Sequence, residues 1–396
     1  MKHLHLILPI FFFLFLFGCK TSKQETNAEK VMLTTIQKQY DILVHSSDIN
    51  LSQKNNIPRT VKNGKTIFVS PYDWTSGFFP GSLWYLYDLT NDEKWKTKAI
   101  EYTETLDTIQ YWGGNHDVGF MIECSYGNAL KNINSKAYEK IIVQTAKSLS
   151  TRFHPKAGII QSWDAGKKWN CPVIIDNMMN LELLFHASKI SKDPTYYNIA
   201  VTHADTTLKN HFRQDNSSYH VLNYNTETGE VLDRNTHQGY TDGSAWARGQ
   251  AWGLYGFTVT YRETKDPKYL QQAIKIANFI MTHPQLPTDK IPYWDYDVSK
   301  TDTTPRDASA AAITASALYE LSIFVSKKEK NKYTKWADTI MKNLKSPVYL
   351  AEDGKNNGFL LYHSVGSLPH KSEIDVPLNY ADYYFLEALF RSEELK

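Results

Sequence analysis

An internal repeat constrains the fold of this 396-residue chain more than any other feature of its sequence. Segments beginning at Leu83, Leu183 and Tyr255 share one pattern, and weaker copies begin near Ala129 and Ala317. Each copy runs from an apolar helix through a short turn rich in Lys, Asp and Pro. An aromatic residue and an alanine then open a second, amphipathic helix. The repeated unit is therefore a helical hairpin of the kind that stacks into larger arrays.

The clearest turns are Asp193-Pro194 and Asp266-Pro267, where aspartate suits a helix cap and proline the first helical position. Apolar residues fall three and four apart, so each helix has a face that one hairpin cannot bury alone. With the first helix (about 29–45) pairing with the last (about 377–394), the copies predict a closed ring, an all-α fold. Long polar inserts that could gather over one mouth favour this ring over an open solenoid. Short loop strands are expected in SSYHVLNYN and in GFLLY near residue 360.

The N-terminus predicts export. A short basic start precedes the apolar run LHLILPIFFFLFLFG, which is too short to span a bilayer comfortably and reads as a secretory signal. The ending Leu16-Phe17-Gly18-Cys19 resembles a bacterial lipoprotein cleavage box; an ordinary signal peptide with a chance cysteine is the alternative. We therefore expect a lipoprotein signal peptide at 1–19, lipidation at Cys19, a polar tether at 20–30 and a single catalytic domain at 31–396. Such a lipoprotein belongs to the bacterial cell envelope, facing the periplasm or the outside.

Charge and cysteine content exclude several other classes. The formal net charge is +2, from 44 basic and 42 acidic residues, so nothing points to nucleic acid, and any membrane contact is expected through the lipid alone. Apart from Cys19, only Cys124 and Cys171 occur, without a zinc-binding pattern, and whether they pair is open. Aromatic residues make up 13% of the chain, which suits either sugar binding or a large helical core.

Two inserts between hairpins carry aspartates. Asp117 lies on a Gly-rich loop before an apolar helix, where a helix cap is the favoured interpretation when it is taken alone. Asp176 follows an apolar segment, and a low-dielectric setting there would raise its pKa, as a general acid requires; a cap is again possible. Equivalent places in consecutive hairpins could point both carboxylates at one cavity, as in enzymes that cleave sugars.

Two further inserts are rich in aromatic residues. In YDWTSGFFPGSLW, Phe78 and Phe79 are expected to fill the core, whereas Trp74 is the better candidate for ligand contact. In THQGYTDGSAWARGQAWGLYGF, Arg248 and Trp252 are four apart and share one helical face. A guanidinium beside an indole suits an acidic sugar, and a cation–π pair inside the core is the alternative.

Together these motifs resemble one known family. The segments WTSGFFPGSLW, HDVGF, IIDNMMNLELL and HQGYTDGSAWARGQAWGLYGF, with DVPLNYADYYFLEAL near the C-terminus, are similar to the unsaturated glucuronyl hydrolases of glycoside hydrolase family 88. The resemblance runs from about residue 30 to 396. It implies an (α/α)6 barrel, which agrees with the ring of hairpins.

The resemblance also implies a reaction without metal or organic cofactor. The substrate is an oligosaccharide that a polysaccharide lyase has left with a 4,5-unsaturated uronic acid at its non-reducing end. Water adds across the C4=C5 vinyl ether, and the hemiketal collapses to release the neighbouring sugar. The general acid/base falls on Asp176 and the second aspartate on Asp117. The substrate-binding positions fall on Trp74, Gln238, Arg248 and Trp252, with His220 matched by spacing and Trp163 as a second aromatic wall.

One departure and two alternatives stay open. Family members that accept sulfated fragments carry Ser-x-x-Ser-x-Lys near the C-terminus; here Ser364 and Ser367 keep the spacing, but Pro369 occupies the lysine position. Recognition of sulfate in that mode is therefore in doubt. A related unsaturated rhamnogalacturonyl hydrolase acting on pectin fragments is one alternative function. A lipid-anchored glycan-binding protein without activity is the other.

Overall fold

The computed structural model describes residues 27–396. The expected signal peptide, the lipidation site Cys19 and residues 20–26 of the expected tether lie outside the described residues. Helix α1 (Asn27–Asp48) already begins at Asn27. Residues 27–30, assigned to the tether from their polar composition, are therefore helical.

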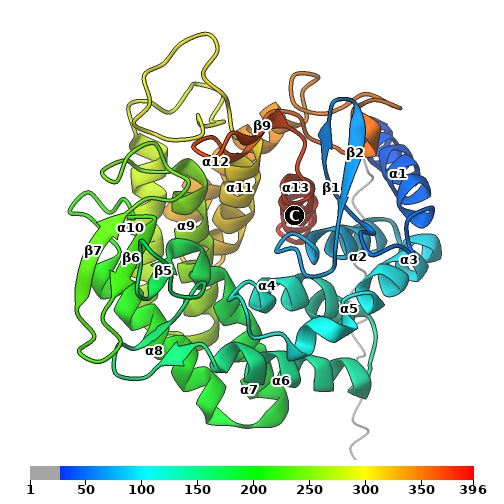
Figure 1. The fold of residues 1–396 in the computed structure, drawn as a ribbon. Coiled ribbons are helices and arrows are strands. Elements are labelled where there is room, and N and C mark those ends of the chain that lie inside the picture. Colours follow the sequence, from blue (N-terminus) through cyan, green and yellow to red (C-terminus); the bar gives the residue numbers. More distant parts are fainter. Residues whose placement is uncertain (1–26) are drawn as a thin grey trace, which may run out of the picture.

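Six helical segments form an inner ring (Figure 1). Each contacts the next along the chain, and the last, α13, packs on α2 and so closes the ring. In chain order they are α2 (Phe78–Thr90); α4 (Val118–Ile122) with the π-helical η2 (Glu123–Gly127) and α5 (Asn128–Asn132); the 3-10 helix η3 (Ile175–Asn180) with α7 (Leu181–Ser191); α9 (Ala247–Thr264); α11 (Ala308–Ser322); and α13 (Asn379–Glu394).

An outer ring alternates with the inner one along the chain. It consists of α1, α3 (Glu93–Glu104), α6 (Lys136–Ser150), α8 (Pro194–Asn210), α10 (Pro267–Thr282) and α12 (Lys327–Leu344). Two short 3-10 helices, η1 (Asp107–Tyr111) and η4 (Asn356–Gly358), lie in the connections. The predicted all-α (α/α)6 barrel is thus confirmed.

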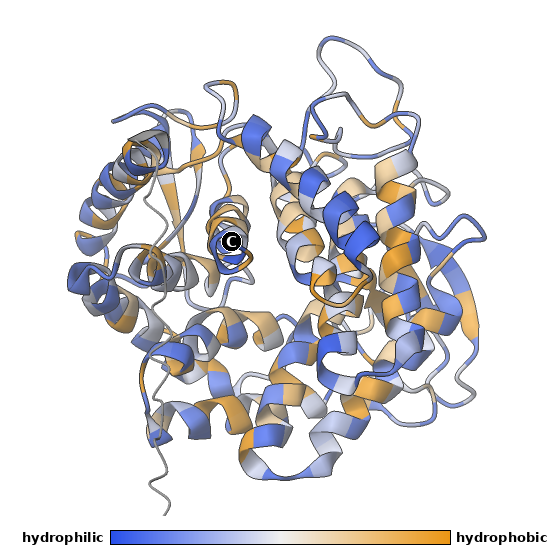
Figure 2. Ribbon diagram, turned by 180° about the vertical axis from the view of Figure 1, so that it is seen from behind, coloured by the Kyte–Doolittle hydropathy of each residue, from blue (hydrophilic) through white to orange (hydrophobic). Residues whose placement is uncertain are grey.

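The two rings differ in how their residues are buried. Every residue of α11 is buried, whereas α12 buries only one face. Figure 2 shows the same contrast, since the outer helices mix hydrophilic and hydrophobic residues around their circumference. At the predicted hairpin turns, the side chains of Asp193 and Asp266 accept from the N–H groups of Thr195 and Lys268 and cap α8 and α10.

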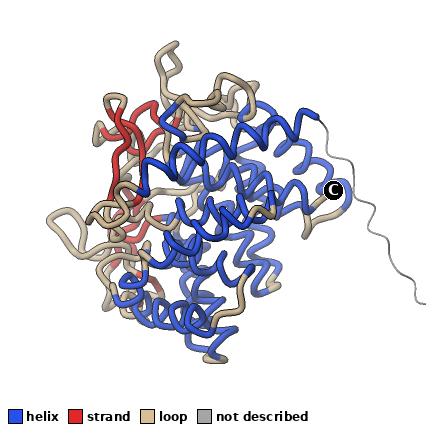
Figure 3. Tube along the Cα trace, turned by 90° about the vertical axis from the view of Figure 1, so that its right-hand side faces the viewer, coloured by secondary structure: helices blue, strands red, loops and turns tan. Residues whose placement is uncertain are grey.

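Short antiparallel strands gather at one end of the barrel (Figure 3). They form the sheets β1 (Ile57–Lys62)–β2 (Lys65–Val69), β3 (Phe153–His154)–β4 (Ile159–Ile160), β5 (Pro172–Ile174)–β6 (Val221–Tyr224)–β7 (Val231–Asn235) and β8 (Ser364–Ser367)–β9 (Ser372–Val376). Strand β6 confirms the strand expected in SSYHVLNYN. Of the strand expected in GFLLY, only one antiparallel bridge forms, between Leu361 and Leu350, because the N–H groups of Leu360 and Leu361 donate to the carboxylate of Asp382 at 2.8 and 2.9 Å.

Both ends of the described chain meet at the opposite end of the barrel. Lys396 Nζ donates to Glu29 in the first turn of α1 at 2.8 Å. The first and last helices therefore meet at their ends, and α1 otherwise packs against α2 and α3, as the Tyr40–Phe79 ring contact and the Lys94–Asp41 ion pair show. Between residues 27 and 396, no helix is both long enough and apolar enough to cross a membrane.

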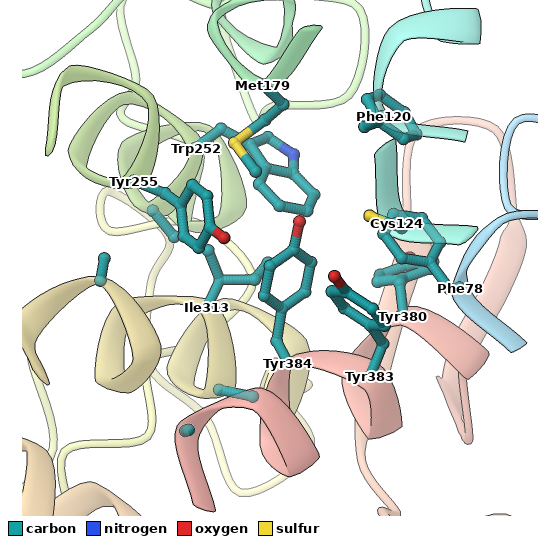
Figure 4. Close-up of a cluster of buried hydrophobic side chains, with 14 of the residues drawn as sticks. Phe78, Phe120, Cys124, Met179, Trp252, Tyr255, Ile313, Tyr380, Tyr383 and Tyr384 are labelled. Atoms are coloured by element: carbon teal, nitrogen blue, oxygen red, sulfur yellow. The ribbon is translucent and has the colours of Figure 1, made fainter. Parts of the chain in front are cut away.

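Aromatic side chains fill the lumen (Figure 4). Trp252 from α9 packs on Tyr384 from α13, with ring centroids 5.4 Å apart. Beyond this layer lies a partly buried ion cluster, whose members are Glu182, Arg262, Glu263, Glu320, Glu387 and Arg391. The lumen is thus a packed core rather than an open channel.

Candidate active site

A cavity of about 310 Å³ opens at the strand-bearing end of the barrel. Seven of the eight substrate and catalytic residues predicted from the sequence line it: Trp74, Asp117, Trp163, Asp176, Gln238, Arg248 and Trp252. The eighth, His220, lies behind Asp176. The inner helices α4, η3, α9 and α13 all begin at this end, and helix N-termini favour bound anions.

Asp176 has the properties of a general acid that works near neutral pH. Burial raises its pKa to about 7, the charge of Arg248 lowers it, and the nearby charge of Asp117 adds to the rise. Its Oδ1 is buried without a hydrogen-bond partner. Neither Asp117 nor Asp176 makes a side-chain cap to its helix, so the cap interpretation favoured for Asp117 alone is wrong.

His220 lies behind Asp176 and does not itself line the cavity. Its Nδ1 accepts from the backbone N–H groups of His237 and Gln238, both at 3.1 Å. Because a backbone N–H only donates, the imidazole proton is on Nε2, which lies 3.6 Å from Oδ1 of Asp176. Burial lowers the pKa of His220 well below its usual value, so the ring stays neutral.

Asp117 has a histidine partner of its own, which the sequence interpretation missed. Nε2 of His116 lies 3.0 Å from Oδ1 of Asp117, and His116 is buried. The backbone N–H of Asp117 donates to the Asn115 side chain at 3.0 Å, which fixes the loop. Each cavity carboxylate is therefore approached by one imidazole Nε2.

Arg248 is largely occupied by protein partners. Its Nη atoms donate to the carbonyls of Val365 and Gly366 and to Asp307, at 2.7 Å for Gly366 and 3.2 Å for Asp307. Its Nε has no partner. The guanidinium packs on the rings of Trp246 and Tyr380, with distances of 4.5 and 5.3 Å to the ring centroids, so the cation–π pair with Trp252 that the sequence left as an alternative does not form. Arg248 thus anchors strand β8 to the cavity as well as carrying charge into it.

Aromatic rings form two walls of the cavity. Trp74 packs on Tyr380 and edge-on against Phe120, with centroids 5.0 and 6.2 Å apart. On the other side Trp163 packs against Trp169 and His237, each at 5.5 Å. Phe78 is buried, as is Phe79, as expected for core residues. Indole faces at this depth suit the apolar faces of a sugar ring.

Several cavity residues had no recognisable signal in the sequence. Arg59 and Glu373 form a two-point ion pair, at 2.6 and 2.8 Å, across 314 positions of the chain. Only closure of the ring brings these two residues together. Ser367, which the sequence did single out, also lines the cavity, and its Oγ lies 2.7 Å from Nδ1 of His370, whereas Ser364 is buried away from the cavity.

The remaining sequence questions concern cysteine and metal. Cys124 and Cys171 are both buried and free. Among residues 27–396, no three His, Cys, Asp or Glu side chains are grouped so as to hold a metal ion. The site therefore offers an acid that is protonated near pH 7, a second carboxylate and aromatic walls, which together suit proton transfer to a bound sugar.

Comparison with known proteins agrees with this geometry. The family model described as Glycosyl Hydrolase Family 88 matches residues 50–263. An unsaturated glucuronyl hydrolase from Formosa agariphila is 46% identical over 380 residues, which cover 94% of each chain.

Two solved structures extend the similarity to three dimensions. An unsaturated glucuronyl hydrolase specific for heparin superposes with a TM-score of 0.88 at 50% identity, covering 93% of this chain and 98% of the other. A mutant unsaturated glucuronyl hydrolase from Streptococcus agalactiae, complexed with dGlcA-GalNAc6S, has a TM-score of 0.75 at 28% identity, covering 94% and 93%. The chain therefore belongs to glycoside hydrolase family 88.

Proposed function

We propose that this enzyme releases 4,5-unsaturated uronic acid from the non-reducing end of oligosaccharides made by polysaccharide lyases, by adding water across the C4=C5 bond. The observation that carries the proposal is the pairing, in one sugar-sized cavity, of Asp117 with an Asp176 whose pKa is raised to about 7. The relatives named above are unsaturated glucuronyl hydrolases, and one was solved with an unsaturated uronate disaccharide.

In the proposed reaction Asp176 first gives its proton to C4. Positive charge develops at C5 beside the ring oxygen, and the new carboxylate of Asp176 stabilises it and takes a proton from the attacking water. The hydroxyl forms a hemiketal at C5, which opens and releases the neighbouring sugar and an open-chain keto acid. Asp176 recovers its proton in the second step, so no net proton is consumed.

The other residues hold the uronate. Asp117 accepts hydrogen bonds from ring hydroxyls, and its negative charge keeps the pKa of Asp176 high. Trp74 and Trp252 enclose the sugar ring, and Trp163 faces the neighbouring sugar. The partner-free Nε of Arg248 and the N-termini of the inner helices favour the uronate carboxylate. The substrate partner is thus an oligosaccharide that ends in an unsaturated uronate.

The test follows the ultraviolet absorbance of the C=C–COOH group with a panel of lyase-generated disaccharides. Absorbance should fall with the wild type and not with Asp176→Asn, and the fastest disaccharide identifies the polymer. A wild type that binds but converts no member of the panel would indicate the glycan-binding alternative. Exclusive conversion of pectin-derived disaccharides would indicate the rhamnogalacturonyl alternative, which the similarities do not favour.

We further propose that the enzyme is a lipoprotein of the cell envelope, with a lipid on Cys19 as its only membrane contact. The support is the sequence of the first 19 residues alone. Mass spectrometry of the mature N-terminus and fractionation of Cys19→Ala test it. An unlipidated N-terminus, or a variant that stays in the membrane fraction, contradicts it.

A further inference from the structure

The loop before α4 and the segment η3 are joined through one buried side chain, Asn180. This residue is fully buried and lies four positions after Asp176. Its Oδ1 accepts a hydrogen bond from the backbone N–H of Phe120 at 3.0 Å. Because a backbone N–H only donates, this contact determines which end of the amide is oxygen. The Nδ2 group must therefore face the opposite way.

Nδ2 of Asn180 faces two acceptors. It lies 3.2 Å from Nδ1 of His116 and 3.3 Å from Oδ1 of Asn177. An amide nitrogen has only hydrogens to offer, so Nδ1 of His116 presents its lone pair and is unprotonated. A neutral imidazole then carries its proton on Nε2, which lies 3.0 Å from Oδ1 of Asp117. The orientation of one amide thus aims the histidine proton at Asp117.

The surroundings leave Asn180 no other position. A Cβ atom on Gly119 would lie 2.5 Å from Cβ and Oδ1 of Asn180, so only glycine allows the loop to approach this closely. The backbone N–H of His116 donates to Ser162 at 3.1 Å, and Asn177 donates to the carbonyl of Ile160 at 2.6 Å. The Asn180 amide is therefore held by the backbone N–H of Phe120, and the backbone of His116 is held by the carbonyl of Ser162.

The charge of His116 bears on the reaction. The titratable groups that interact with its ring are Asp117, Asp176, His203 and His220. A positive charge on His116 would lower the pKa of Asp176 and neutralise Asp117. The neutral tautomer leaves the charge of Asp117 uncompensated, and that charge helps to keep Asp176 protonated.

We propose that Asn180 is a positioning residue for the hydration reaction: it holds His116 as the neutral Nε2–H tautomer, and His116 in turn orients the Asp117 carboxylate toward the substrate. The catalytic part of this inference rests on the proposed function. The tautomer is a property of the free enzyme, so it can be tested without any substrate.

The first experiment is ¹⁵N NMR of the full chain, labelled at histidine, at neutral pH, with the His116 signals assigned by their loss in His116→Gln. The wild type should show Nε2 protonated and Nδ1 unprotonated. In Asn180→Asp, the new carboxylate should draw a second proton onto Nδ1. Asn128→Asp is the matched control: it also buries a carboxylate, here beside Lys131, at a residue that contacts neither Asn180 nor His116, and it should leave the tautomer unchanged. A wild-type His116 protonated at Nδ1 would overturn the proposal, whatever the activity.

The second experiment is a mutant cycle on kcat. Asn180→Asp should lower kcat about 10- to 100-fold, the cost typical of losing a partner that orients a functional histidine. Glutamine at position 116 still donates to Asp117 but cannot become charged, so in the His116→Gln background the same change should cost less than about 3-fold. Thermal unfolding of each variant confirms the folded fraction. An equal cost in both backgrounds would show that Asn180 is only a structural support and would refute the proposal.

Discussion

Asp176 and Glu182 lie six residues apart on one continuous inner segment, yet their pKa values move in opposite directions. Burial is the largest influence on both and raises both. At Asp176 it prevails and brings the pKa to about 7. At Glu182 the charge and hydrogen bond of Arg262 outweigh it and lower the pKa to about 2. Burial alone therefore does not make a catalytic acid; what matters is whether a cation is free to pair with it.

The two nearby arginines explain the difference. Arg262 gives all its nitrogens to carboxylates, namely those of Glu182, Glu263 and Glu320. Arg248, near Asp176, is held instead by two backbone carbonyls and by Asp307. Its charge is already partly neutralised, and its Nη atoms are bonded to groups other than Asp176. The barrel thus uses similar residues for stability in the ion cluster and for reactivity in the cavity.

Among the substitutions that test this difference between Asp176 and Glu182, Asp176→Asn should have the largest effect on activity. We expect kcat to fall about 10³-fold, because a positioned general acid contributes about 10²- to 10⁴-fold. Stability should change in the opposite sense. The native state binds the Asp176 proton more tightly than the unfolded chain, so stability is lost as pH rises from about 4 to 7, by at most about 4 kcal/mol.

In Asp176→Asn the side chain does not titrate, so the stability of this variant does not fall as pH rises from about 4 to 7. It should melt at or above the wild-type temperature at pH 8 and lose this advantage at pH 5. Turnover assays and thermal melts at the two pH values check both halves. Activity within tenfold of wild type would remove Asp176 from its assigned role.

The matched change Glu182→Gln should have the reverse profile. It removes one of the three carboxylates around Arg262. Because this pair is partly exposed to solvent, we expect a loss of about 1–2 kcal/mol in the free energy of unfolding. The kcat of the folded fraction should stay within about twofold of wild type. Denaturant titration beside single-temperature kinetics measures both. A large fall in kcat without loss of stability would mean that the ion cluster takes part in catalysis.

The dependence of kcat/KM on pH tests the raised pKa of Asp176. Because Asp176 acts as an acid, kcat/KM should fall as pH rises through about 7. In Asp117→Asn the residual activity should fall at a lower pH, because the charge of Asp117 raises the pKa of Asp176. Profiles of both enzymes on one disaccharide decide this. An unmoved alkaline limb would show that the two carboxylates are not coupled.

The smallest expected effect is the opposite shift in Arg248→Gln. The charge of Arg248 lowers the pKa of Asp176, so its removal should move the alkaline limb upward. The anchoring of Val365 and Gly366 is also lost, which should raise KM. Arg248→Lys, which keeps the charge, is the control and should leave the limb in place. If the alkaline limb moves equally in both variants, the shift comes from loss of the anchoring of Val365 and Gly366 and not from loss of the charge.

Much of this architecture could be predicted because it is local. Apolar residues three and four apart and the Asp-Pro turns specify the hairpins, and both turns cap helices as expected. The pairing of Arg59 with Glu373 could not be predicted, because no pattern near either residue refers to the other. The role of Asp117 was ambiguous in the sequence, because it too depends on segments distant along the chain. A loop aspartate before a helix is usually a cap, and only the tertiary position of Asp117 shows that its carboxylate faces a cavity instead.

Closure of the ring by α13 also has a consequence for the order of folding. Asn379 donates to the carbonyl of Pro58, 321 positions earlier, and Tyr380 packs on Trp74 and on Arg248. Such contacts carry a high loop-closure cost and cannot form until the last helix has left the ribosome. The cavity is therefore completed only when α13 docks, so the last helix must be synthesised and released before the first turnover.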